Sequence, residues 1–290
     1  MFGFSLKKCF ATAKTEYIKW ICDARMIIFA VLLIFIYNFA IIPLLDNAEL
    51  MGKPLNMLEP FVAIANSKMI LLIIPLVFLT LIADFPKIDT NTLFYIVRVG
   101  RINWVVGQIL KLVFMAITVI TAVFIGAVVP MLGRGFWGSQ WSEVAKDFVD
   151  TFPEMSGSFG VELLPANLYN QRPLLTLAVQ SYVLLFAYLL VIGLLLLFFS
   201  LIRQKITGFI LCGGVITAGA ALCAINSRIM WATPMAHSII WMHYTKYFRE
   251  PIVSMEASVV YFVTVIFVLI VFCCVAITFF DYDNVTEIAM

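Results

Sequence analysis

Long apolar stretches alternate with short charged or proline-containing segments along the whole chain. Each stretch holds about 19 residues or more, which at ~1.5 Å rise per residue is enough for a helix to cross a ~30 Å hydrocarbon core. The six stretches cover residues 26–45, about 61–82, 111–129, 174–202, 206–224 and 259–280. The pattern predicts an all-α polytopic membrane protein with six transmembrane helices, folded as a single transmembrane domain over residues 1–290.

The second stretch is the least regular of the six. Its most apolar part, residues 69–83, follows Asn66, Ser67 and Lys68, where we expect a turn near the outer membrane face. Pro75 removes one backbone hydrogen bond and clashes with the preceding turn, so it predicts a kink within this helix.

Composition excludes a soluble domain, because 63% of the residues are hydrophobic and 12% are charged. We find no catalytic motif and expect no enzymatic activity in this chain. Gly52-Lys53-Pro54 lacks the other glycine and the Ser or Thr of a phosphate-binding loop. The apolar stretches also lack the repeated Asp or Glu typical of ion-coupled transporters. An energy source, if one is needed, must come from another polypeptide.

Charge predicts the orientation in the membrane. With six spans both termini share one side, and that side holds 11 of the 19 Lys and Arg residues but only 7 of the 17 acidic residues. Positive loops stay in the cytoplasm. We therefore expect a multi-pass protein of the cell inner or plasma membrane with both termini cytoplasmic.

Residues 1–25 show no cleavable signal peptide and instead have a helical apolar face. Apolar and aromatic residues recur there at intervals of three and four: Phe2, Leu6, Phe10, Ala13, Tyr17, Trp20 and Ile21. This spacing predicts an amphipathic helix in the headgroup plane. A solvated basic leader is the alternative, but Tyr17 and Trp20 at the expected interface depth favour the helix.

Two segments on the predicted outer side are too long for turns. In residues 130–173, apolar spacing from Trp141 onward predicts an outer helix that ends at Pro153, followed by an irregular stretch. Residues 225–257 are apolar and aromatic but interrupted, which favours re-entrant or interfacial helices. His237 and His243 are six residues apart and share no helical face, so we interpret them as interfacial histidines rather than a proton site.

The connection over residues 84–104 is the most informative part of the cytoplasmic side. A helix beginning near Leu93 would offer Phe94 as an apolar contact and place Arg98 and Arg101 on one face before Trp104. Such a helix can dock on a partner protein whose acidic groups pair with the arginines. Equally, its arginines can contact lipid phosphate at the membrane surface.

A second cytoplasmic connection, Arg203-Gln204-Lys205, is so short that it forces the two flanking helices to be neighbours. The helix that follows contains a series of small residues around Gly213 and Gly214. Small residues let membrane helices approach closely. This face is either an internal packing seam or a dimer contact.

Four stretches together resemble the six-helix permease subunits of ABC exporters of the ABC-2 type. Glu16-Tyr17, followed by Asp23-Ala24-Arg25, resembles the entry helix of that family, and residues 98–104 resemble its coupling helix. The turn at residues 203–205 is similar to its second cytoplasmic contact, and residues 230–247 are similar to its re-entrant helices. The long 130–173 segment departs from a minimal member and leaves substrate and subfamily open.

The resemblance implies a working unit of two permease subunits, identical or homologous, with two ATPase subunits. ATP and Mg would be bound by the ATPase, so this chain needs no cofactor. Contact with the ATPase would fall on the cytoplasmic residues Leu93, Phe94, Arg98, Arg101, Trp104, Arg203 and Lys205. The entry helix would use Glu16, Tyr17, Trp20 and Arg25. Membrane lipid is the other expected partner, and nucleic acid is not expected.

The implied substrate is an amphiphile, such as a peptide antibiotic, a bacteriocin, a lipid or a drug. Two readings from other classes stay open. An autonomous secondary transporter or channel would move its substrate without an ATPase, but it lacks visible ion sites. A membrane scaffold or immunity protein would bind a toxin without moving it.

Overall fold

The structure is a computed structural model that describes residues 4–87, 90–245 and 251–279. Within those ranges the chain is helical and contains no strand. Five helical segments are long and apolar enough to cross a membrane, which agrees with a multi-pass membrane protein. They are Met26–Met51, Arg101–Met131, Leu174–Leu201, Lys205–Ala224 and Met255–Phe279.

Each segment contains one main helix, and some carry short extensions. The first comprises α2 (Met26–Ile36), a π-helical turn (Tyr37–Ile41) and α3 (Ile42–Met51). The others are built on α7 (Arg101–Val128), α11 (Leu174–Leu201), α12 (Lys205–Ala224) and α14 (Met255–Ala276), with 3-10 turns at Val129–Met131 and Ile277–Phe279. The third span thus begins at Arg101, earlier than the predicted residue 111.

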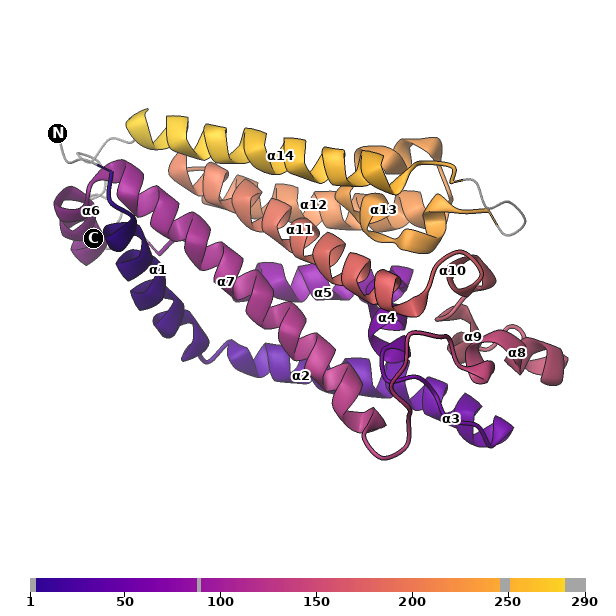
Figure 1. The fold of residues 1–290 in the computed structure, drawn as a ribbon. Coiled ribbons are helices and arrows are strands. Elements are labelled where there is room, and N and C mark those ends of the chain that lie inside the picture. The colour runs from indigo at the N-terminus through magenta and orange to yellow at the C-terminus, as the bar shows by residue number, and fades with distance from the viewer. Residues whose placement is uncertain (1–3, 88–89, 246–250, 280–290) are drawn as a thin grey trace.

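The bundle is organised around α11. This helix contacts α7, α12 and α14, and it is the most buried of the five spans. Figure 1 shows two ends: α1 (Leu6–Ile21), α6 (Thr90–Val99) and the start of α7 lie at the left, which we call the N-terminal end. The short helices that follow α7 and α12 lie at the right, which we call the opposite end.

The second predicted span is broken rather than straight. α4 (Glu59–Asn66) and α5 (Lys68–Leu81) meet at 79° across Ser67, so the pair is either one bent span or a re-entrant loop. The main bend lies at Ser67, within the turn that the sequence predicted at residues 66–68, and Pro75, where a kink was also predicted, lies inside the continuous helix α5. Every residue of α4 is buried, because this helix crosses the bundle next to α11 (Figure 1).

Hydrogen bonds of Asn66 explain the break. Its side-chain amide donates to the Val62 carbonyl (2.8 Å) and to the Ser181 hydroxyl (2.9 Å). Its side-chain oxygen accepts from the Ile240 backbone N–H (2.8 Å), and its carbonyl accepts from the indole N–H of Trp241 (2.9 Å). The carbonyl that would continue the helix is thus satisfied by the opposite end of the bundle instead.

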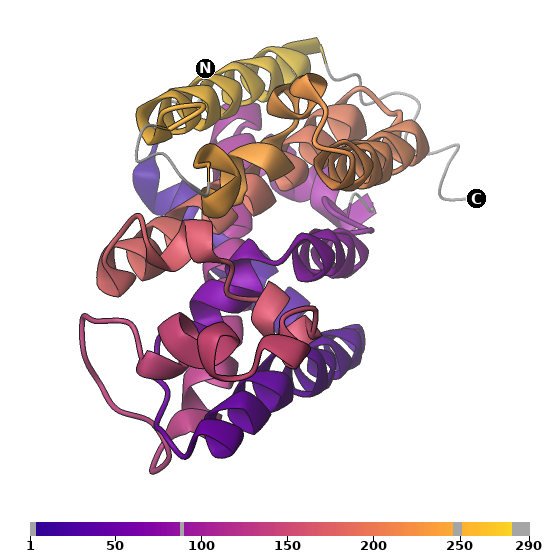
Figure 2. The ribbon, with the colours of Figure 1, turned by 90° about the vertical axis from the view of Figure 1, so that its right-hand side faces the viewer.

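Short helices close the opposite end, as Figure 2 shows from that side. Between α7 and α11 they are α8 (Glu143–Thr151), a 3-10 turn (Pro153–Met155), α9 (Phe159–Glu162) and α10 (Ala166–Tyr169). α8 confirms the helix predicted after Trp141, and Ser142 caps it by accepting from Ala145 N–H. The stretch after Pro153, expected to be irregular, is instead largely short helices.

Between α12 and α14 the chain forms a 3-10 turn (Arg228–Ala232), α13 (Pro234–Ser238) and a second 3-10 turn (Ile240–His243). These pieces are too short to span a membrane, as predicted. Whether they enter the membrane from one side stays a prediction. Residues 246–250, part of the same predicted segment, lie outside the described residues.

Candidate functional site

The N-terminal end of the bundle brings together most of the residues that the sequence singled out. α1 lies along α7, which confirms the predicted N-terminal helix and shows what its buried face contacts. The Ser5 backbone N–H donates to the Asn103 side-chain oxygen (2.9 Å), and the Tyr17 hydroxyl is 2.6 Å from that of Thr118. The position of α1 relative to the lipid headgroups stays a prediction.

A glycine allows the close approach of these two helices. A Cβ added at Gly107 would lie 2.7 Å from Cβ of Thr12 and 3.0 Å from the Cys9 carbonyl oxygen. Real Cβ atoms do not come so close, so only glycine fits here. α1 is therefore fixed against α7 by shape as well as by hydrogen bonds.

α6 is a separate helix, set off from α7 by Gly100. The backbone of Gly100 has φ = 96°, a conformation that side chains other than glycine rarely adopt. Arg98 belongs to α6 and Arg101 to α7. The prediction that both arginines lie on one helical face is therefore wrong. The helix is described over Thr90–Val99, but the side chains of Leu93 and Phe94 lie outside the described part.

The described side chains of α6 divide into an inner and an outer set. Ile96 and Val99 are buried, and the Tyr95 hydroxyl is 3.1 Å from that of Thr12 on α1. Val97 and Arg98 are exposed. α6 is thus held on the α1–α7 pair while it presents an apolar and a basic side chain outward.

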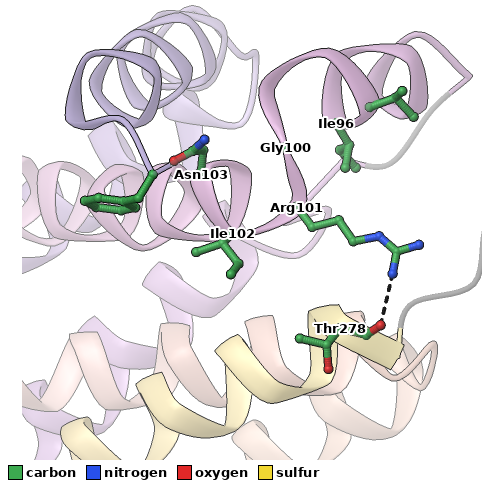
Figure 3. A pocket seen from close by; sticks show the side chains of 8 residues that line it. Ile96, Gly100, Arg101, Ile102, Asn103 and Thr278 are labelled. Atoms are coloured by element: carbon green, nitrogen blue, oxygen red, sulfur yellow. Dashed lines mark hydrogen bonds between the residues drawn. The ribbon is translucent and has the colours of Figure 1, made fainter. Parts of the chain in front are cut away.

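Arg101 has a contact within the chain. Its guanidinium donates to the Thr278 carbonyl at the end of α14 (2.9 Å), as Figure 3 shows. This contact closes one side of a cavity of about 460 Å³, lined by Phe4, Ile96, Val97, Gly100, Arg101, Ile102, Asn103 and Thr278. Trp104, which the sequence placed in the cytoplasmic connection, is instead buried in α7.

Asp84 joins three separate segments. Its carboxylate accepts from the Arg25 guanidinium at the start of α2 and lies 3.5 Å from the Lys205 ammonium at the start of α12. The hydrogen bond from Arg25 and the nearby Lys205 charge hold the pKa of Asp84 below its usual value, against a smaller effect of burial. Arg203 is exposed and lies in the turn before α12, with φ = 63°.

Lys111 is the buried cation of this end. Its ammonium lies 3.6 Å from a Glu16 oxygen and 5.1 Å from the centre of the Phe85 ring. Glu16 also accepts from Lys19 (2.8 Å), and the Trp20 indole N–H donates to the Leu81 carbonyl (3.1 Å). The predicted entry-helix residues Glu16, Trp20 and Arg25 therefore contact α7, α5 and the Asp84 segment within the chain.

The sequence contains a further signal for this arrangement that the apolar lengths of the spans do not show. Small or polar residues Asn103, Gly107 and Lys111 recur every four positions in α7, which places them on one face of an otherwise apolar helix. That face is the one α1 covers. Among the described residues, no group of three His, Cys, Asp or Glu side chains is placed to hold a metal ion.

Comparison with known proteins adds no relative. No protein-family model, curated protein or solved structure matches the chain.

Proposed function

We propose that the chain is the transmembrane permease subunit of an ATP-driven ABC exporter, with the N-terminal end of the bundle in the cytoplasm. The observation that carries the proposal is α6. It is a short helix with an exposed basic outer side, and its inner side is fixed to α1 and to the start of the long helix α7. A push on α6 by a partner would be transmitted directly to a membrane-spanning helix.

The Asp84 segment supports a second point of contact. Arg203 is exposed in the turn between α11 and α12, and the adjacent Lys205 is linked through Asp84 to Arg25 at the start of α2. A partner that binds this turn would act on three apolar segments at once. Ion pairs at a surface are easily rearranged because each pair contributes little to stability by itself.

The proposed assembly contains a second permease subunit and two ATPase subunits. Along their most apolar stretches, only about a quarter of the residues of α12 (28%) and α14 (22%) are buried within the chain. These apolar helices therefore have surface left for lipid or for a second copy. We extend the proposal to an amphiphilic substrate, such as a peptide antibiotic, a bacteriocin, a lipid or a drug, which would move along such surfaces.

The test is the affinity of the ATPase for purified permease in lipid nanodiscs, together with substrate-stimulated ATP hydrolysis. A charge-assisted hydrogen bond contributes about 1.5–3 kcal/mol, so Arg98→Ala should weaken binding roughly tenfold or more and lower coupled hydrolysis. Arg228→Ala, an exposed arginine at the opposite end, is the matched control. Arg101→Ala is a less specific test, because it also removes the contact with Thr278.

Three results would contradict the proposal. In the first, the Arg98→Ala and Arg101→Ala double variant assembles with the ATPase and hydrolyses ATP as the unmodified protein does. In the second, liposomes that contain only this chain transport a substrate when an ion gradient is the sole driving force. That result would establish an autonomous secondary transporter. Toxin resistance that persists with an inactive ATPase would instead indicate an immunity or scaffold protein.

A further inference from the structure

The two histidines of the chain meet at one hydroxyl group. His237 lies on α13, His243 on the following 3-10 turn, and Ser258 one turn into α14, and all three are buried. The Ser258 hydroxyl is 2.8 Å from Nδ1 of His237 and 3.4 Å from Nε2 of His243. We call these three residues the histidine pair.

The contacts of His237 fix where its hydrogen lies. Its Nε2 is 2.7 Å from the Trp231 carbonyl oxygen. A carbonyl can only accept, so Nε2 carries the hydrogen. In the neutral ring Nδ1 is then an acceptor, and the Ser258 hydroxyl donates to it. The neutral form of His237 is therefore fully hydrogen-bonded.

The same reasoning gives a different result for His243. Its Nδ1 is 2.8 Å from the Val253 carbonyl, so Nδ1 carries the hydrogen and the neutral Nε2 is an acceptor. The nearby side-chain group is the Ser258 oxygen, whose one hydrogen is already donated to His237, and the His237 carbonyl also acts on the ring. Nε2 of neutral His243 therefore faces an oxygen lone pair. A hydrogen at Nε2 would turn this unfavourable contact into a hydrogen bond.

We infer that the histidine pair is a binding site for a single proton, taken up at Nε2 of His243 while His237 stays neutral. With the proton bound, a continuous chain of hydrogen bonds runs from the Val253 carbonyl through His243 and Ser258 to His237 and the Trp231 carbonyl. The bound proton would tie the segment between α12 and α14 more firmly to α14.

A second proton is opposed by the geometry. It would have to enter at Nδ1 of His237, where the Ser258 hydroxyl would then accept from two imidazolium rings at once. Their ring centres are 6.5 Å apart, so two positive charges would repel each other in a buried site. The pair thus takes up one proton where two independent histidines would take up two.

Aromatic rings and burial act on the bound charge in opposite directions. The Trp231 ring lies 4.8 Å from that of His243, which favours a cation on His243. Burial favours the neutral rings, and although the Val253 and His237 carbonyls oppose it, the pKa of His243 is below its usual value. The pKa of His237 is also lowered, chiefly by burial. We therefore expect His243 to take up its proton at a lower pH than an exposed histidine does.

No other charge at the site is needed for this result. The titratable side chains on the elements packed against the histidine pair are Tyr169, Tyr182, Tyr188, Lys205, Cys212, Cys223, Arg228, Glu256, Tyr261, Cys273 and Cys274. Glu256 is the one carboxylate among them, and it is exposed. Lys246 and Glu250 lie outside the described residues.

The chain allows a direct test because it contains two histidines in all. The full chain, purified with an affinity tag that lacks histidine and kept in a chelator, is labelled with ¹³C-histidine and followed by NMR from about pH 8 to about pH 5. We expect one imidazole signal to titrate, with a midpoint below about 6.5, and the other to shift only slightly. His243→Gln assigns the titrating signal, which should disappear.

Ser258→Ala separates the shared site from two ordinary buried rings. Without the hydroxyl the two imidazoles lose their common partner, so the His237 signal should titrate or shift independently of His243. Three outcomes in the unmodified protein would overturn the inference: both signals titrating independently, neither titrating by about pH 5, or His237 titrating while His243 does not.

Discussion

The two ends of the bundle are held together by different kinds of contact. At the N-terminal end, exposed or partly exposed charges link the segments, and Asp84 with Arg25 and Lys205 is the main example. At the opposite end, buried hydrogen bonds of neutral or single-charge groups link the segments, such as Asn66 with Ile240 and Glu59 with Ser142, beside an exposed ion pair between Lys53 and Glu143. Buried hydrogen bonds are costly to break, whereas surface ion pairs are not.

The difference fits the proposed function. An end that exchanges force with a partner must rearrange, and weak ion pairs permit this at little cost. An end that closes the bundle is stabilised by buried hydrogen bonds that break cooperatively. At the opposite end, the fully buried Glu59 carboxylate accepts hydrogen bonds from the Ser142 backbone N–H (2.6 Å) and hydroxyl (2.8 Å). These bonds fix α8 against α4.

The largest effect is expected at the opposite end from Asn66→Ala. The substitution leaves the buried Ile240 N–H and the Ser181 hydroxyl without their partner, which should lower the free energy of unfolding by about 3 kcal/mol. Asn38→Ala is the matched control, because Asn38 makes only the local bond to the carbonyl four residues earlier (2.8 Å) that Asn66 also makes. Unfolding in SDS or by heat measures both.

The control should change stability by less than about 0.5 kcal/mol, as is usual for exposed sites. If the two asparagine variants lose the same stability, the contacts that join α4 to the α13 region contribute nothing. The contrast between the two ends would then be wrong.

An intermediate effect is expected at the N-terminal end from Gly107→Ala. The new methyl group would overlap Thr12 and the Cys9 backbone, so α1 must shift from α7 at a cost of about 1–3 kcal/mol. Gly213→Ala is the control, since a Cβ there has no atom within 4 Å and alanine favours a helix. Hydrogen exchange in α1, with thermal unfolding, distinguishes the two.

Faster exchange in α1 of the Gly107 variant alone would show that shape, rather than charge, attaches the N-terminal helix. Equal exchange and equal stability of both glycine variants would mean that α1 can move away freely.

The sequence predicted the parts of the fold that depend on local pattern. Apolar length predicted the five long helices that can span a membrane, and three- and four-residue spacing predicted α1 and α8. Gly100 stands between Arg98 and Arg101, but the three-residue spacing of the arginines by itself predicts that they share a helical face. A positive φ at Gly100 ends α6, which the sequence treated as one helix with the start of α7.

Other features depend on residues far apart in the chain. The turn at residues 66–68 was predicted, but its hydrogen-bond partners Ile240 and Trp241 were not, because no spacing within α4 reveals them. His237 and His243 were correctly judged unable to share a helical face. They meet because Ser258, on a different helix, lies between them. Helical periodicity describes neighbours within one element only.

The smallest effect is expected from Asp84→Asn. Its side chain is 57% exposed, so loss of its ion pairs with Arg25 and Lys205 should cost less than about 1 kcal/mol. The exposed Asp46→Asn, at the end of the first span, is the control. Moderate salt should remove most of the difference between these two variants, because exposed charges are screened.

The pH dependence of Asp84 gives the sharper measurement. Its pKa is lowered in the folded protein, chiefly by the hydrogen bond from Arg25, so the unfolded chain binds a proton there more readily. The stabilisation is fully present above the ordinary aspartate pKa of about 4 and is lost as the pH falls through the lower, folded value. Asp84→Asn should flatten this acid limb of the stability curve, and Asp46→Asn should not. A cost as large as that of Asn66→Ala, or one insensitive to salt, would show that the N-terminal end is as firmly closed as the other.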